Sequence, residues 1–245
     1  MDQTKIFAHR GSKGTHPENT MAAFREAVRL GADGIELDVH LTRDKQVVVI
    51  HDEMVDRTTN GTGFVKDYSL QELKQLDAGS WFHPSYEEET IPTLEEVFTV
   101  IRETPLQVNI ELKTDHIQYE GIEDQVIQLV RQHQLEDRVI LSSFNHYSLV
   151  KTKQLAPEME TGILFMEGLF EPWEYAKRLG ASALHCYYPI AFSPIGIEAL
   201  QQGMAVRPFT VNNEEHIKQL LQQKISAIIT DYPEKAMEIK RSYNK

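Results

Sequence analysis

The chain has 245 residues, of which 41% are hydrophobic, so it can bury one substantial core or two small ones. Its 37 acidic residues outnumber its 25 lysine and arginine residues, and the resulting net charge of -12 argues against non-specific binding to nucleic acid or to an anionic bilayer. The single cysteine, Cys186, excludes an intrachain disulfide and is compatible with a reducing compartment.

No stretch of the sequence approaches the ~18 consecutive apolar residues of a membrane-spanning helix. The first residues, Met1-Asp2-Gln3-Thr4-Lys5, run directly into an apolar strand and leave no room for a signal peptide. We therefore predict a cytoplasmic protein with no stable membrane insertion, unless a leader has been removed. The sequence does not indicate the oligomeric state.

Short apolar runs rich in β-branched residues alternate with longer segments of helical period, as is typical of an α/β protein with a largely parallel sheet. The predicted strands are Lys5 to His9, Gly34 to Leu41, Val47 to His51, Gln107 to Leu112, Val139 to Ser143, Thr161 to Leu164, Ala183 to Tyr187, Ala205 to Val211 and Ala227 to Thr230. The predicted helices are about Thr20 to Leu30, Thr93 to Glu103, Ile122 to His133, Tyr147 to Leu155, Pro172 to Leu179, Pro194 to Gln202 and Glu214 to Gln223.

Roughly eight βα units in about 250 residues favour a closed (β/α)8 TIM barrel over an open doubly wound sheet. We predict that residues 1–245 form a single domain of this kind. The segment 52–92 breaks the rhythm, because it contains turn-rich sequence and one short helix, near Ser69 to Leu76, but no core strand. We interpret it as a small subdomain inserted at one end of the barrel.

Ionisable residues stand where the first predicted strand ends. His9 and Arg10 place a titratable ring and a fixed cation at this carboxyl end, where a TIM barrel builds its active site. Taken alone, such a pair is more often the start of a solvated loop. Its meaning therefore depends on the neighbouring strands.

The second strand carries two acids. Glu36 and Asp38 alternate with apolar residues, so both carboxylates lie on one face of the strand. Two like charges this close repel each other and are costly to desolvate. A solvated strand face is possible, but a hard divalent cation explains the pattern better.

Two further strands end in the same way. The continuous apolar run Val47 to Ile50 terminates in His51, and the link that precedes it is too short for a crossover helix, so this part of the barrel is irregular or hairpin-like. Farther along, Glu111 and Lys113 share one face at the end of another strand. In a barrel these side chains converge on one mouth.

These residues resemble those of the glycerophosphodiester phosphodiesterase family, which shares a (β/α)8 barrel with phosphoinositide-specific phospholipases C. The resemblance covers nearly the whole chain. It is carried by His9-Arg10-Gly11, Pro17-Glu18-Asn19-Thr20, Glu36-Leu37-Asp38-Val39, His51-Asp52, Asn60-Gly61-Thr62-Gly63, Pro92-Thr93-Leu94, Glu111-Leu112-Lys113 and Ile229-Thr230-Asp231-Tyr232-Pro233.

The resemblance implies a role for each ionisable residue. Glu36, Asp38 and Glu111 bind one divalent metal, for which hard oxygen ligands favour Mg²⁺ or Ca²⁺, with Mn²⁺ also possible. His9 and His51 are the acid and the base. The phosphate is contacted by Arg10 and Lys113.

One departure from the family pattern concerns substrate recognition. A late strand commonly reads Trp-Thr-Val-Asn in the family, whereas this chain has Phe209-Thr210-Val211-Asn212. An aromatic wall at Phe209 remains, but without the area and the donor of an indole ring. The substitution leaves the head-group preference of the substrate open.

The implied reaction is hydrolysis of a small glycerophosphodiester to glycerol 3-phosphate and an alcohol. The first nucleophile is either the glycerol hydroxyl of the substrate or water. Two alternatives stay open: lysophospholipase D or phospholipase C-like activity on lysophospholipids, and a non-catalytic barrel that binds a phosphorylated metabolite. The second alternative explains the two histidines less well, since binding alone requires no acid–base pair.

Overall fold

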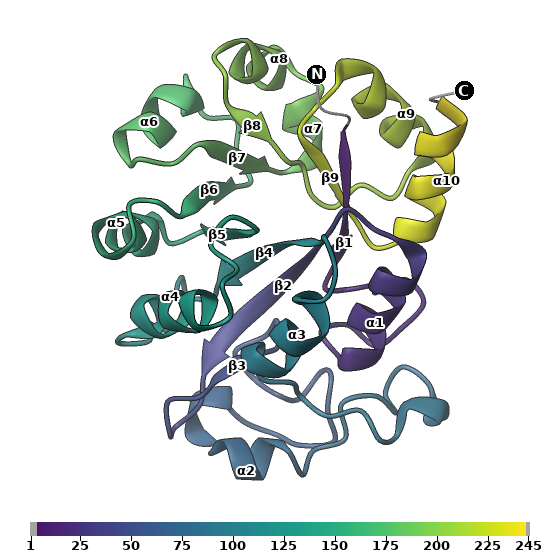
Figure 1. Ribbon diagram of the computed structural model, residues 1–245, viewed down its shortest axis with the longest axis vertical. Helices are drawn as coiled ribbons and strands as arrows, with labels where there is room; N and C mark the ends of the chain where they lie inside the picture. The colour runs from purple at the N-terminus through teal and green to yellow at the C-terminus, as the bar shows by residue number, and fades with distance from the viewer. Residues whose placement is uncertain (1–3, 244–245) are drawn as a thin grey trace.

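The structure is a computed structural model and describes residues 4–243. Its main sheet consists of parallel strands in the spatial order β8-β7-β6-β5-β4-β2-β1-β9 (Figure 1). These strands are β1 (Lys5–His9), β2 (Gly34–Leu41), β4 (Gln107–Leu112), β5 (Val139–Ser143), β6 (Glu160–Phe165), β7 (Ala183–Cys186), β8 (Ala205–Val206) and β9 (Ala227–Thr230).

Helices follow the strands and surround the sheet (Figure 1). They are α1 (Met21–Leu30), α3 (Leu94–Ile101), α4 (Ile122–Gln132), α5 (His146–Leu155), α6 (Pro172–Arg178), α7 (Tyr188–Ala191), α8 (Pro194–Gln201), α9 (Glu214–Gln223) and α10 (Pro233–Tyr243). Within residues 4–243, no helix combines the length and the apolar character needed to cross a membrane.

The two ends of the sheet meet through backbone hydrogen bonds. The Ser226 amide donates to the Val206 carbonyl at 3.2 Å, and the Ile229 amide donates to the Pro208 carbonyl at 3.1 Å. The Val211 amide in turn donates to the Ile229 carbonyl at 2.9 Å. The predicted (β/α)8 TIM barrel is therefore confirmed.

The alternation of side chains along β2 sets the two faces of the barrel wall. Leu37 and Val39 are buried in the large apolar cluster that lies between the strands and helices α1, α3 and α4. Glu36 pairs with His9 across β1 and β2, so both side chains lie on the opposite, inward face. Below them, the barrel interior is filled by an apolar group of Phe7, Ile140, Ala227 and Ile229.

The short strand β3 (Val47–Val49) runs antiparallel to β2, in agreement with the expected hairpin-like turn. It is shorter than predicted, because the prediction extended this strand to His51. The Asp38 carbonyl accepts from the Ile50 amide at 3.1 Å, but from Glu36 backwards the same edge of β2 pairs with β1. The edge is thus already occupied, and His51 lies beyond the ladder.

Strand β8 is also shorter than the predicted Ala205 to Val211. Regular pairing ends at Val206, and Pro208 follows, which has no amide hydrogen to donate to a ladder. The chain nevertheless continues beside β7, since the Phe209 amide donates to the Cys186 carbonyl at 3.0 Å. This extension carries Phe209 to the carboxyl end of the barrel.

The segment 52–92 contains only short helices, η1 (Val65–Asp67), α2 (Leu70–Leu73) and η2 (Pro84–Tyr86). Helix α2 is shorter than the predicted Ser69 to Leu76, and Ser69 caps it together with Glu72 in a capping box. The segment has its own small apolar cluster, which packs on the β3 residue Val48. Its status as a separate subdomain stays a prediction.

Candidate active site

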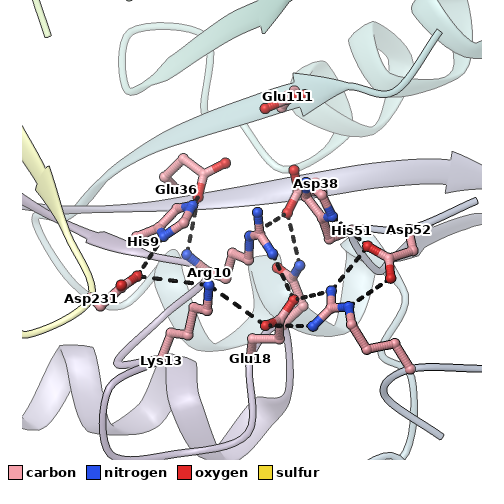
Figure 2. Close-up of polar contacts among 12 residues, drawn as sticks. His9, Arg10, Lys13, Glu18, Glu36, Asp38, His51, Asp52, Glu111 and Asp231 are labelled. Carbon is pink, nitrogen blue, oxygen red and sulfur yellow. Dashed lines mark hydrogen bonds and ion pairs between the residues drawn. The ribbon is translucent and has the colours of Figure 1, made fainter. Parts of the chain in front are cut away.

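Three buried carboxylates meet at the carboxyl end of the barrel. Glu36 and Asp38 come from β2 and Glu111 comes from β4, where it lies directly beside Asp38 in the ladder. One oxygen of each carboxylate lies within 4.8 Å of the others. The three residues are 4%, 1% and 8% exposed, respectively. Figure 2 shows them above the neighbouring histidines.

Crowding and burial act on all three acids. Burial raises the pKa of Glu36 well above its ordinary value, and the charges of Asp38 and Glu111 raise it further. Burial likewise raises the pKa of Glu111 to about 7, although Lys113 opposes this shift. Burial would also raise the pKa of Asp38, but the positive charges of Arg10, His51 and Lys113 lower it. The neighbouring side chains therefore supply too little positive charge for all three carboxylates to be ionised together.

The donor set suits a hard divalent cation. Asp38 Oδ2 accepts a hydrogen bond from Asn19 Nδ2 at 2.9 Å, whereas buried Asp38 Oδ1 has no hydrogen-bond partner among residues 4–243. An unpartnered buried carboxylate oxygen is costly unless a cation or water binds it. Carboxylate oxygens are the ligands that Mg²⁺ and Ca²⁺ prefer. These residues therefore fit a divalent metal.

His9 is oriented by an acid from the loop that follows β9. Its Nδ1 lies 2.6 Å from Asp231 Oδ1, and Asn212 Nδ2 donates to the other oxygen of this carboxylate at 2.7 Å. Burial would raise the pKa of Asp231, but the hydrogen bond from His9 lowers it to about 2. An ionised Asp231 only accepts, so the His9 proton sits on Nδ1. His9 Nε2 faces the cluster, 3.9 Å from Glu36 Oε2.

His51 has a similar arrangement. Its Nδ1 lies 2.6 Å from Asp52 Oδ1, so an acid again fixes the ring and leaves Nε2 for other contacts. Burial lowers the pKa of His51, although Asp38 and Asp52 oppose the shift. Two histidines therefore lie beside the carboxylate cluster, each held at Nδ1 by its own aspartate.

Arg57, from the segment 52–92, links two acids that hold residues of this site. Its Nε donates to Asp52 Oδ2 at 2.6 Å, and its Nη2 donates to Glu18 Oε1 at 2.8 Å. The same Glu18 oxygen accepts from Arg10 Nη1 at 2.7 Å. One guanidinium thus connects the acid that orients His51 with the acid that holds Arg10.

The backbone at Arg10 is turned towards the acids. Arg10 has a φ of 51° and Gly11 a φ of 78°, both in the left-handed region. This conformation lets the Arg10 amide donate to Glu36 Oε2 at 3.0 Å. A Cβ on Gly11 would lie 2.7 Å from the Ala23 backbone, so glycine is required there both for its φ and for the close approach.

Lys113 supplies a second buried cation. Its Nζ donates to Glu111 Oε1 at 3.0 Å, and the residue is 6% exposed. Burial alone would lower the pKa of Lys113, but the charges of Glu111 and Asp38 raise it, so the amine stays protonated. Lys113 and Arg10 provide fixed positive charge on two sides of the cluster.

Residues 9–235 match the glycerophosphoryl diester phosphodiesterase family. This chain belongs to that family.

Other proteins, including one of solved structure, are similar to this phosphodiesterase along almost its whole length. A protein of Caldanaerobacter subterraneus named glycerophosphodiester phosphodiesterase is 46% identical over 239 residues, covering 98% of each chain. A Bacillus altitudinis protein of the same name is 45% identical, covering 97% of this chain and 98% of its own. An Oleispira antarctica phosphodiesterase, solved with the product sn-glycerol-3-phosphate, is 35% identical with a TM-score of 0.87, covering 97% and 96% of the two chains. The predicted enzyme class is confirmed.

The phosphodiesterase fold brings the predicted site residues together. His9, Arg10, His51 and Lys113 lie around the acids Glu36, Asp38 and Glu111, as expected from their places at strand ends. Phe209 lies at the end of the β8 extension, where its ring contacts Phe144 edge-on at 6.0 Å between centroids. The chemical roles of all these residues stay predictions.

Sequence reasoning missed the residues that support the site. Asp52 and Asp231 lie inside motifs that were recognised, but no pattern pairs Asp231 with a histidine 222 positions away. Glu18 and Asn19 were likewise visible only as part of a motif. Arg57 gave no signal at all, because its partners are brought to it by the fold.

Arg57→Lys tests the link that Arg57 makes between Asp52 and Glu18. We expect turnover by this phosphodiesterase to fall about tenfold, because lysine keeps the charge but cannot donate to Asp52 and Glu18 with one planar group. Steady-state kinetics on a glycerophosphodiester and thermal unfolding provide the measurements. Arg43→Lys is the matched control, since Arg43 donates to Glu72 and to the Asp67 carbonyl at an exposed position. Equal turnover in both variants would refute the link.

Proposed function

We propose that the protein hydrolyses glycerophosphodiesters to glycerol 3-phosphate and an alcohol in a reaction that depends on a divalent metal. The observation that carries this proposal is the pair of acid-held histidines beside a buried cluster of three carboxylates. The sn-glycerol-3-phosphate bound to the Oleispira antarctica relative supports the assignment of the product.

A phosphodiester needs positive charge around its phosphoryl oxygens. A divalent cation held by Glu36, Asp38 and Glu111, Mg²⁺ or Ca²⁺ with Mn²⁺ as a further candidate, would supply Lewis acidity there. Lys113 would contribute its protonated amine to the phosphate. Arg10 is bound to Glu18 through Nη1, so other donors of its guanidinium would bind the phosphate. The bound cation and the two basic residues together would favour an anionic substrate despite the net charge of -12.

Proton transfer is assigned to His9 and His51. Each ring is held through Nδ1, so each would use Nε2 towards the substrate. One histidine would accept a proton from the attacking hydroxyl, and the other would donate a proton to the leaving alkoxide. The attacking hydroxyl belongs to the substrate's own glycerol or to water.

The mouth of the barrel also carries apolar side chains. Phe209 and Phe144 form an aromatic pair, and Tyr187 is bridged to Phe209 through the backbone. We assign Phe209 to contact with the substrate's alcohol group. A longer apolar approach would suit lysophospholipids, which makes lysophospholipase D activity the competing assignment. We also propose that the protein is cytoplasmic and acts there on a small glycerophosphodiester.

His9→Ala and His51→Ala test the acid–base pair. Each should lower turnover about 10²- to 10⁴-fold, because a positioned proton-transfer group contributes that much. Turnover of glycerophosphocholine is measured together with the circular dichroism spectrum, which should match that of the parent. His116→Ala is the control, since the His116 side chain is 74% exposed. Near-parental turnover in either of the first two variants would sink the assignment.

Glu36→Gln tests the metal role. We expect the metal concentration that gives half-maximal activity to rise at least about tenfold, because a neutral amide replaces an anionic ligand. The measurement is a metal titration of activity after treatment with a chelator. Glu88→Gln, at an exposed position, should titrate like the parent. Activity that is unchanged by both the chelator and the Glu36 substitution would rule out the metal role.

A substrate panel separates the two enzymatic assignments. Glycerophosphocholine, glycerophosphoethanolamine and lysophosphatidylcholine are assayed with Mg²⁺, Ca²⁺ and Mn²⁺ in turn. We expect the glycerophosphodiesters to be cleaved with release of glycerol 3-phosphate, because the site combines phosphate-binding cations with a short aromatic wall. Cleavage of lysophosphatidylcholine alone would favour the lysophospholipase assignment.

A further inference from the structure

The buried histidine His40 has no part in the chemistry described above. It lies on β2, on the same face as Glu36 and Asp38, and is 0% exposed. Its Nδ1 lies 2.9 Å from the Tyr119 hydroxyl oxygen, and its Nε2 lies 3.1 Å from the His51 carbonyl oxygen. Tyr119 stands 79 positions away, between β4 and α4. A continuous polar chain therefore ends on the backbone of His51.

The direction of these hydrogen bonds follows from their partners. A carbonyl oxygen can only accept, so His40 Nε2 carries the proton. A fully buried ring with no carboxylate as a hydrogen-bond partner is neutral, so Nδ1 accepts. The Tyr119 hydroxyl must then donate. Tyr119 thereby fixes the tautomer in which His40 can hold the His51 carbonyl.

His51 needs such a support because its strand ends before it. Regular pairing of β3 with β2 stops at Val49, and the Ile50 amide makes the last contact with the Asp38 carbonyl. Beyond the end of the ladder, the His40 side chain holds the backbone by donating to the His51 carbonyl. The other support of His51 is more exposed, since the Asp52 and Arg57 side chains are 30% and 44% exposed. Of the two contacts that hold His51, the one from His40 is therefore the buried one.

We propose that His40 and Tyr119 are positioning residues that set the place of His51 through its backbone carbonyl. The proposal rests on the assignment of His51 to proton transfer. Neither residue belongs to the carboxylate cluster or to the groups assigned to the phosphate, so loss of the pair should displace the His51 ring while leaving those binding groups in place. Turnover should suffer, whereas KM and metal affinity should not.

The chain contains a matched control for this arrangement. His146 Nδ1 lies 3.0 Å from the Tyr175 hydroxyl oxygen, and His146 Nε2 lies 2.9 Å from the Leu164 carbonyl oxygen. The ring centroids are 5.5 Å apart in both histidine–tyrosine pairs. Leu164 belongs to β6 and is no part of the proposed site. The two pairs share their bonding pattern, but the pair at His40 is more deeply buried and the two pairs hold different carbonyls.

The first experiment compares Tyr119→Phe with Tyr175→Phe. Both variants lose one hydroxyl donor, so both are expected to unfold at a lower temperature. Only Tyr119→Phe should lower kcat, by about tenfold, with KM and the half-saturating metal concentration within about twofold of the parent. Kinetics are measured well below the unfolding temperature of each variant. Equal kcat in Tyr119→Phe and Tyr175→Phe would overturn the proposal.

The second experiment asks whether the bond to the carbonyl is what counts. His40→Gln keeps an amide donor that can reach the His51 carbonyl, whereas His40→Met has a side chain of similar length without a donor. We expect His40→Gln to retain kcat within about threefold of the parent and His40→Met to lose about tenfold or more. Equal losses in the two folded variants would contradict a positioning role.

These outcomes are distinguishable from failure of the underlying assignment. If His51→Ala keeps parental turnover, the proton-transfer role of His51 is wrong and the positioning proposal falls with it. If His51→Ala is inactive while Tyr119→Phe and His40→Met turn over like the parent, only the positioning proposal is wrong. A shift in metal requirement in His40→Met would show that its effect passes through Asp38 instead.

Discussion

The site is governed by the repulsion among three carboxylates that the barrel forces together. Glu36, Asp38 and Glu111 are buried, with one oxygen of each within 4.8 Å of the others. Such a cluster cannot be fully ionised without compensating charge. Arg10 and Lys113 provide part of that charge, and the donor set fits a divalent cation for the rest. A cation held there, with Arg10 and Lys113, would supply the positive charge that a phosphodiester substrate requires.

The remaining polar groups hold this arrangement in one geometry. Asp231 reaches His9 from the loop after the last strand, and Asp52 reaches His51 from the segment that follows β3. Arg57 ties that segment to Glu18, and through Glu18 to Arg10. The segment 52–92 is therefore connected to the proposed site by charge-assisted hydrogen bonds, whereas its apolar cluster packs on β3.

Much of this could be predicted from the sequence, because strand period and strand ends are local signals. The alternation at Glu36 and Asp38 placed two acids on one face, and the barrel topology explained how Glu111 joins them. The length of the strand before His51 could not be predicted, since it depends on which edge of β2 is free. The end of β8 was predictable from Pro208, which lacks an amide hydrogen, but the predicted strand ran through it. The partners of Asp231 and His40 are set by long-range packing, which leaves no periodic trace.

The proposed reaction depends most on one divalent cation binding to the three carboxylates. Isothermal titration calorimetry of the chelator-treated protein with Mg²⁺, Ca²⁺ and Mn²⁺, without substrate, measures this directly. We expect one ion per chain for at least one of these metals, and loss of that binding when Glu36 and Glu111 are both changed to glutamine. Absence of binding at millimolar metal, or equal binding by the double variant, would contradict a metal site at these carboxylates.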